Sequence, residues 1–308
     1  MKHAARNYLV GAPDRPRSVV VAQSLFMELK KRDPACRIEV LADPGVMPLL
    51  EIMPEVAGFL LLPEHSWLRE QMNFVNESRS SGYDRGIILQ SGWRFAIFPF
   101  LAGISVRSGY LPGVMLNDVR VADPCWTTVQ RTVSLGLATG AELPDRFASP
   151  SLDNRFQDWE RVLQRHGIAP DSDPVLVLCP DVEDRTTPGW AEHYQRLAGE
   201  AVRRGWQVVL LAEASDAGFG ERICGRATGC HNLVGKLSLA EEVDLLSVAD
   251  LVIGDQSGSM YLALGLRRQV LMLASPDHLD GIREFFPEGW FLPLETDSAE
   301  IVSVLEDS

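Results

Sequence analysis

The 308-residue sequence lacks features that would place it in several protein classes. No apolar run approaches the about 20 residues that cross a bilayer as a helix, so any membrane contact is predicted to be peripheral. The cysteines show neither a CxxC motif nor metal-like spacing: Cys36, Cys125, Cys179, Cys224 and Cys230. Their odd number and the lack of a signal peptide predict a reduced, cytoplasmic setting.

An excess of positive charge is also lacking. The 42 acidic residues outnumber the 29 Lys and Arg residues, which gives a net charge of −13. This balance argues against broad nucleic-acid binding, although local basic patches remain compatible with it. The six histidines are scattered without the spacing of metal ligands, so no metal site is predicted.

Strands and helices alternate in the first half of the chain. "RNYLVGAP" predicts a strand at Tyr8 to Val10, and "SVVVAQSLFMELKKRDP" predicts a helix because its apolar residues recur every four positions. Further strands are predicted in "CRIEVLADP", "GFLLLP" and "YDRGIILQS", with helices in "VMPLLEIMPEV" and "WRFAIFPFLAG". This βαβ order predicts an α/β fold with a parallel sheet.

The same alternation restarts in the second half, from "PVLVLCP" to "QVLMLAS". Between the halves lies a less regular stretch in which Pro144 and Pro150 mark a boundary near residues 145–160. We therefore predict two domains, 1–150 and 151–308. Two open α/β domains facing each other form a central cleft, and their ligands bind outside the carboxyl ends of the strands.

One stretch, "LVIGDQSGSMYLALGL", combines a strand, a turn and a helix. Its apolar run ends at Gly254-Asp255, and a helix is predicted from Met260 to Leu266. The first amides of a helix lack intrahelical partners and carry partial positive charge, which suits a phosphate. The sequence therefore predicts a phosphate-binding turn at Gln256, Ser257, Gly258, Ser259 and Met260.

Several segments together resemble a known family: "AQSLFMELKKRDP", "MPLLEIMPEV", "YDRGIIL", "FPFLAGI", "LNDVRV" and "NLVGKLSLAEEVDLLSVADLVIGDQSGSMYLALGL". They run from about Ala22 to Ser275. In order and spacing they are similar to the ADP-heptose:lipopolysaccharide heptosyltransferases, particularly the heptosyltransferase II group of glycosyltransferase family nine. The resemblance implies the GT-B fold, in which two Rossmann-like parallel-sheet domains face a central cleft.

The resemblance also implies a reaction. A heptose would move with inversion from an ADP-sugar donor, bound by the C-terminal domain, to a sugar hydroxyl of an anionic glycolipid acceptor, bound by the N-terminal domain. No metal or other cofactor is required, and the enzyme would work in the cytoplasm at the inner face of the inner membrane. Such a site needs a carboxylate base, donors for the leaving diphosphate and closure against water.

At the position of the family's catalytic aspartate, this sequence departs from the pattern. Ser18 occupies it, preceded by Arg17 where the family has glycine, and Asp14 lies nearby in "GAPDRPRSVVV". A serine needs an adjacent base before it can act, so Asp14 and Ser18 are predicted together as the catalytic positions. Alternatively, both residues cap or enter the first helix, where their types are favoured.

Two regions on the donor side also differ from the family pattern. Pro188 stands where the family has a phosphate-binding lysine, which leaves Arg185, Thr186 and Thr187 as predicted phosphate contacts or as part of a solvated loop. In the family's Asp-Ser/Thr-Gly-x-x-His turn, Gln256 and Tyr261 replace the acid and the histidine. The backbone cradle depends on glycine and turn shape, although a plain strand-to-helix turn is the alternative.

On the acceptor side, arginines stand at the expected places. Arg94 follows the fourth strand, Arg17 lies near the first turn, and Arg120 ends "LNDVR". Local arginines in an acidic protein suit an anionic, phosphorylated acceptor, although surface arginines are common.

Two hypotheses about activity stay open at this point. The first is an active sugar transferase, and the second is a catalytically degenerate relative that binds a nucleotide or glycan or acts as a scaffold. Each departure in an active enzyme would cost about 10²- to 10⁴-fold in rate. A Rossmann oxidoreductase is discounted because no GxGxxG follows the first strand.

Overall fold

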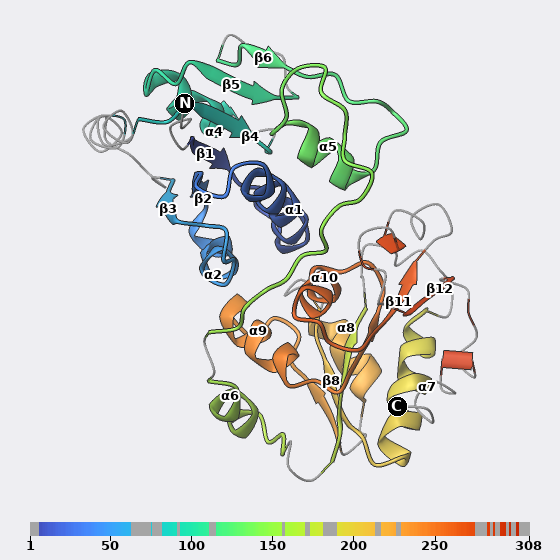
Figure 1. Cartoon of the computed structure of the whole chain (residues 1–308). Helices are drawn as coiled ribbons and strands as arrows, with labels where there is room; N and C mark the ends of the chain where they lie inside the picture. Colours follow the sequence, from blue (N-terminus) through green and yellow to red (C-terminus); the bar gives the residue numbers. More distant parts are fainter. Residues whose placement is uncertain are drawn as a thin grey trace. The chain divides into compact units, whose positions relative to one another are not determined.

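The computed structural model describes residues 6–62, 75, 82–90, 93–110, 115–155, 158–169, 173–180, 190–212, 217–225, 229–274, 282–283, 286, 290–293, 296 and 300–301. The chain forms two compact units, Met1–Pro150 and Ser151–Ser308 (Figure 1). Within the described residues, no helix is long and apolar enough to cross a membrane.

The first unit is built on a parallel sheet. Its strands lie in the order β3-β2-β1-β4-β5-β6, and every ladder between them is parallel. Central β1 pairs Val10 with Val40 and Ile87. The strands are β1 (Asn7–Gly11), β2 (Arg37–Ala42), β3 (Gly58–Leu61), β4 (Arg85–Ile88), β5 (Val106–Gly109) and β6 (Asp118–Val119).

The helices of this unit are α1 (Pro16–Arg32), the short η1 (Pro44–Val46), α2 (Met47–Glu51), α4 (Trp93–Leu101) and α5 (Thr128–Ser134). Helix α1 packs against α2 and α5 and is buried over most of its length. Its buried polar groups find partners: Gln23 donates to Glu55 (3.0 Å), and Ser24 donates to the carbonyl of Ala148 (3.0 Å). These bonds hold α1 to distant parts of its own unit.

The second unit repeats the arrangement. Its strands lie in the order β12-β11-β10-β7-β8-β9, again with parallel ladders throughout. They are β7 (Val175–Cys179), β8 (Gln207–Leu210), β9 (Cys230–Asn232), β10 (Leu251–Gly254), β11 (Val270–Ala274) and β12 (Trp290–Pro293). The helices are α6 (Trp159–Arg165), α7 (Trp190–Arg203), α8 (Ala217–Cys224), α9 (Leu239–Ser247) and α10 (Gly258–Gly265).

The α/β prediction is confirmed in both units. Numbered from its own first strand, each sheet has the order 3-2-1-4-5-6 of dinucleotide-binding folds. The order reverses between β1 and β4 in the first unit and between β7 and β10 in the second. Ligands of open α/β sheets bind at such switch points, so the turn after β10 lies where a ligand is expected.

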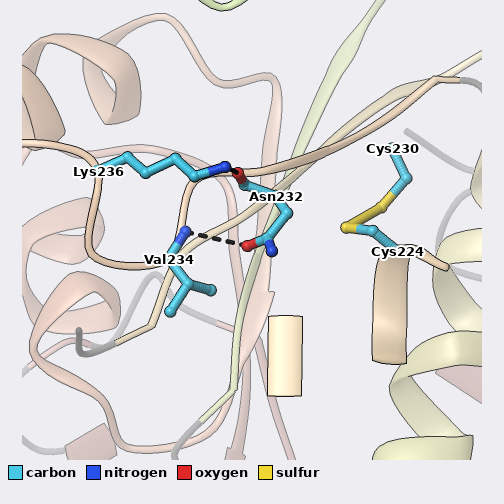
Figure 2. The surroundings of a disulfide bond; sticks show 5 residues. All are labelled: Cys224, Cys230, Asn232, Val234 and Lys236. Carbon is cyan, nitrogen blue, oxygen red and sulfur yellow. Dashed lines mark hydrogen bonds between the residues drawn. A yellow bond between two sulfur atoms is a disulfide. The ribbon is translucent and has the colours of Figure 1, made fainter. Parts of the chain in front are cut away.

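No disulfide was predicted from the sequence, and the structure contains one. Cys224 at the end of α8 and Cys230 at the start of β9 form a disulfide (Figure 2). Beyond it, Asn232 accepts hydrogen bonds from the amide of Val234 (3.2 Å) and, through its carbonyl, from Lys236 (2.8 Å). The bridge thus closes the α8–β9 connection at the amino end of β9.

A close approach between β7 and β10 leads to the first prediction. A Cβ at Gly254 would lie 2.2 Å from the carbonyl oxygen of Cys179, which is backbone and has little room to move. We expect Gly254→Ala to lower the free energy of unfolding by at least about 2 kcal/mol, measured by urea denaturation.

Gly199→Ala in α7 is the matched control for this substitution, because a Cβ there meets nothing within 4 Å. It should raise the free energy of unfolding by up to about 1 kcal/mol. Equal effects of the two substitutions would contradict the close approach.

Candidate functional site

The turn after β10 leads directly into helix α10. Ser257 is the N-cap of α10 in extended conformation, but its side chain makes no cap hydrogen bond and instead donates to the carbonyl of Cys179 (3.3 Å). Gln256 to Ser259 are partly exposed, whereas the side chain of Met260 is fully buried. The amides of the first turn of α10 are therefore not capped by Ser257.

Asp255 holds the start of α7 against the end of β10. Its buried carboxylate accepts hydrogen bonds from the indole nitrogen of Trp190 (3.1 Å) and the hydroxyl of Tyr194 (2.9 Å). Asp255 is therefore a positioning residue inside the unit. Sequence analysis missed this role because the partners lie more than 60 residues away along the chain.

A second carboxyl group lies directly at the first turn of α10. Ser259 donates a hydrogen bond to Glu242 of α9. Burial raises the pKa of the Glu242 carboxyl, and the bond from Ser259 offsets only part of this effect. Burial and then the charge of Glu242 raise the pKa of the Cys179 thiol. Desolvation thus disfavours negative charge on both Glu242 and Cys179, although Glu242 keeps part of its surface in solvent.

Tyr261, at the family's histidine position, is part of the core. It is buried and packs edge-to-face on Phe286, with ring centroids 6.1 Å apart. The other predicted donor contacts, Arg185, Thr186 and Thr187, lie outside the described residues, as does Pro188. Among the residues that are described, no group of three or more His, Cys, Asp or Glu side chains could hold a metal ion.

The predicted catalytic residues of the first unit follow β1. Arg15 is the N-cap of α1 without a side-chain cap bond, exposed Asp14 precedes it, and Ser18 is the third helical residue. Neither Asp14 nor Ser18 therefore occupies the cap position that the alternative interpretation offered, although Ser18 does lie in the first turn.

Two predicted acceptor contacts flank the switch point of this unit. Arg17 is the second residue of α1, which follows β1, and exposed Arg94 is the second residue of α4, which follows β4. Since β1 and β4 are paired neighbours, the carboxyl ends of both strands meet at one edge of the sheet. The structure thus brings the helix starts that carry Asp14, Arg17, Ser18 and Arg94 to the same edge.

Arg120, the third predicted acceptor contact, is engaged inside the unit. It donates to both carboxylate oxygens of Asp118 (2.8 and 2.9 Å) and to the carbonyl of Leu137 (2.8 Å). Arg85 and Ser108 also donate to Asp118, each at 2.8 Å. Burial would raise the pKa of the Asp118 carboxyl, but these hydrogen bonds and the arginine charges outweigh it and lower the pKa.

The carboxylate of Asp255 leads to a stability prediction. Asp255→Ala leaves the buried donors of Trp190 and Tyr194 without their acceptor, so we expect the free energy of unfolding to fall by about 2–5 kcal/mol. Tyr194→Phe removes one donor and leaves the carboxylate paired, so it should cost about 1 kcal/mol. Urea denaturation of both variants measures the difference, and similar costs would show that Asp255 does not hold the two side chains together.

Glu242 leads to a pH prediction. The pKa of the Glu242 carboxyl is raised in the folded state, so the unfolded chain loses this proton at lower pH than the folded chain does. The contribution of Glu242 to the free energy of unfolding is therefore full below the unfolded pKa and is lost as the pH rises through the folded pKa. Glu242→Gln keeps an acceptor for Ser259 without a charge. The variant should be more stable than the parent at pH 8, with a smaller difference at pH 4, in thermal melts. A pH-independent difference would contradict this assignment.

Comparison with known proteins places the chain beside one family of enzymes. A family model described as "Glycosyltransferase family 9 (heptosyltransferase)" matches residues 72–278. The chain is 30% identical to lipopolysaccharide heptosyltransferase 2 of Escherichia coli K12, over 88% of this chain and 83% of that protein. It is 28% identical to lipooligosaccharide heptosyltransferase 2 of Haemophilus influenzae, over 97% and 89% of the two chains.

Solved structures extend the likeness to the fold. The structure of E. coli ADP-heptose LPS heptosyltransferase II superposes with a TM-score of 0.81 at 26% identity, over 98% of both chains. E. coli heptosyltransferase WaaC with ADP matches with a TM-score of 0.70 at 16% identity, over 98% of this chain and 99% of the other, which is a likeness of fold alone. The predicted GT-B architecture of two Rossmann-like domains is confirmed. The family model covers more than half of this chain, so the chain belongs to glycosyltransferase family 9, the heptosyltransferases.

Proposed function

We propose that this protein transfers a heptose or a related sugar, with inversion, from an ADP-sugar to the core of lipopolysaccharide or a similar glycan. The observation that carries this proposal is the β10–α10 turn, which lies at a switch point and leaves the first amides of α10 uncapped by Ser257. The names of the relatives, lipopolysaccharide heptosyltransferase 2 and ADP-heptose LPS heptosyltransferase II, support the donor and acceptor classes.

On the donor side, the turn residues Gln256, Ser257, Gly258, Ser259 and Met260 would hold the diphosphate through backbone amides. Arg185, Thr186 and Thr187 would add side-chain contacts. The hydrogen bond from Trp190 to Asp255 fixes the start of α7 beside the end of β10. Arg185 to Thr187 precede Trp190 by three to five residues, which is a reach of at most about 10–18 Å.

On the acceptor side, Asp14 is the proposed base, with Ser18 beside it in the sequence. Arg17 and Arg94 would bind anionic groups of the acceptor, because guanidinium groups pair well with phosphate. Arg120, also predicted as a contact, would act indirectly by holding β6 through Asp118.

The reaction then follows in one displacement. Asp14 takes the proton of the acceptor hydroxyl, and the oxygen attacks the anomeric carbon from the face opposite the diphosphate. The bond from that carbon to the diphosphate oxygen breaks, ADP leaves, and the configuration inverts. The amides at the start of α10 stabilise the negative charge that grows on the leaving group.

The same proposal gives the setting. The protein would act in the cytoplasm, in peripheral contact with the inner face of the inner membrane, since its acceptor is a glycolipid. It would use no cofactor, and its N-terminal domain would bind the acceptor.

A transfer assay tests the proposed function. The parent protein is incubated with ADP-heptose and heptose-deficient core lipopolysaccharide, and the acceptor is weighed by mass spectrometry. We expect a gain of one heptose mass. Asp14→Asn should lower kcat by about 10²- to 10⁴-fold because it removes the base.

Glu142→Gln is the matched control, since Glu142 is an exposed carboxylate of the same unit and the same change of charge is made. It should leave kcat unchanged. An inert parent beside a working family member would overturn the proposed activity on this substrate pair and favour a catalytically degenerate relative. Full activity of Asp14→Asn would overturn the assignment of the base.

A further inference from the structure

Helix α4 is apolar on its outer side as well as on its inner side. Its inner residues Phe95, Ala96 and Phe98 belong to a core cluster with strand residues Leu9 and Ile88. Its outer stripe follows the helical spacing i, i+4, i+7, i+8 with Trp93, Ile97, Phe100 and Leu101.

The outer stripe lies largely in solvent. Trp93 is 66% exposed, Phe100 42% and Leu101 37%, and Val106 at the start of β5 is 38% exposed. We call Trp93, Phe100, Leu101 and Val106 the α4 outer face. A helix on the surface of a globular protein normally turns charged or polar residues outward. Large apolar side chains gathered on one exposed helix mark an interaction surface.

The sequence segment that carries this face has charges of one sign, whereas exposed Asp84, just before the segment, lies beside Ser105. The sequence contains no Asp or Glu between Asp84 and Asp118, although acids outnumber bases in the whole chain. The same segment carries three arginines, of which Arg85 pairs with Asp118 and Arg94 is exposed on α4. The α4 outer face is therefore an apolar surface within a locally basic segment of an acidic protein.

The third arginine is fixed against the face itself. The guanidinium carbon of Arg107 lies 5.3 Å from the centroid of the Phe100 ring. Arg107 also donates to the carbonyls of Ile104 and Met115. These contacts hold a positive charge beside an exposed aromatic ring, where it can meet an anionic partner.

We propose that the α4 outer face docks on an anionic phospholipid bilayer. Trp93 and Phe100 enter the headgroup region, where aromatic rings are favoured, and Arg94 and Arg107 contact lipid phosphates. A bilayer fits this face better than an acidic protein because, on the proposed function, the acceptor is itself a glycolipid. The proposed acceptor contact Arg94 follows Trp93 directly, so docking would present Arg94 to acceptors held in the same membrane.

Insertion at this face is shallow. Helix α4 has nine residues and is about 13 Å long, and no described helix is able to span a bilayer. Binding is expected to combine burial of a few apolar side chains with attraction between arginines and anionic lipid. It should therefore weaken as salt screens the charges.

Sedimentation of the full chain with lipid vesicles tests the proposal without any need for transfer activity. We expect the parent to bind vesicles that contain phosphatidylglycerol and to bind pure phosphatidylcholine vesicles weakly. The double variant Trp93→Ser, Phe100→Ser should bind the anionic vesicles at least about tenfold more weakly, because two apolar side chains no longer enter the lipid. The matched control Trp290→Ser, which changes an exposed Trp of β12, should bind as the parent does.

Circular dichroism melts establish that the variants fold, and the single variant Leu101→Ser provides a milder change on the same face. No binding of the parent to anionic vesicles would overturn the proposal. Equal binding by parent and folded variants would also overturn it. So would a concentration-dependent dimer in size-exclusion chromatography that the double variant abolishes, because the face would then join two copies.

The two proposals fail separately. Vesicle binding without transfer would refute the proposed reaction and leave the docking surface intact. Transfer to a detergent-solubilised acceptor without vesicle binding would refute the docking surface and leave the proposed reaction intact.

Discussion

The second unit depends on the contact between the ends of β7 and β10. Gly254 lets the backbone of Cys179 approach where any side chain would collide. One residue later, Asp255 takes hydrogen bonds from Trp190 and Tyr194 and so ties α7 to the same strand end. The first turn of α10 then begins from a fixed position, which is what a backbone-amide site requires because amides cannot adjust as side chains do.

The first unit reaches a comparable arrangement by different means. Its switch point is formed by β1 and β4, and the following helices α1 and α4 carry the proposed base and arginines. Farther along the sheet, Asp118 gathers Arg85 and Arg120 and keeps short β6 in register. Such a cluster stabilises the fold only while all its charged partners are present. The Asp118 and Arg120 side chains of "LNDVR" are therefore used to hold the unit together.

Local patterns in the sequence were sufficient for much of the fold. Alternating apolar runs located β1, α1 and β10, and the strand-turn-helix pattern located the turn at Ser257-Gly258. Two-residue β6 gives too short a pattern to be recognised, and β12 was not predicted either. The partners of Asp255 and Arg120 could not be predicted, because each depends on residues that only folding brings together. The disulfide between Cys224 and Cys230 was not predicted for the same reason, because the spacing of the two residues in the sequence does not indicate a bond.

The position of that bond in the sheet separates it from the turn after β10. Cys224 and Cys230 meet at the amino end of β9 (Figure 2), whereas the turn after β10 emerges from the carboxyl end of its strand. In a parallel sheet these are opposite rims. The disulfide therefore lies on the rim of the sheet opposite the one from which the turn after β10 emerges.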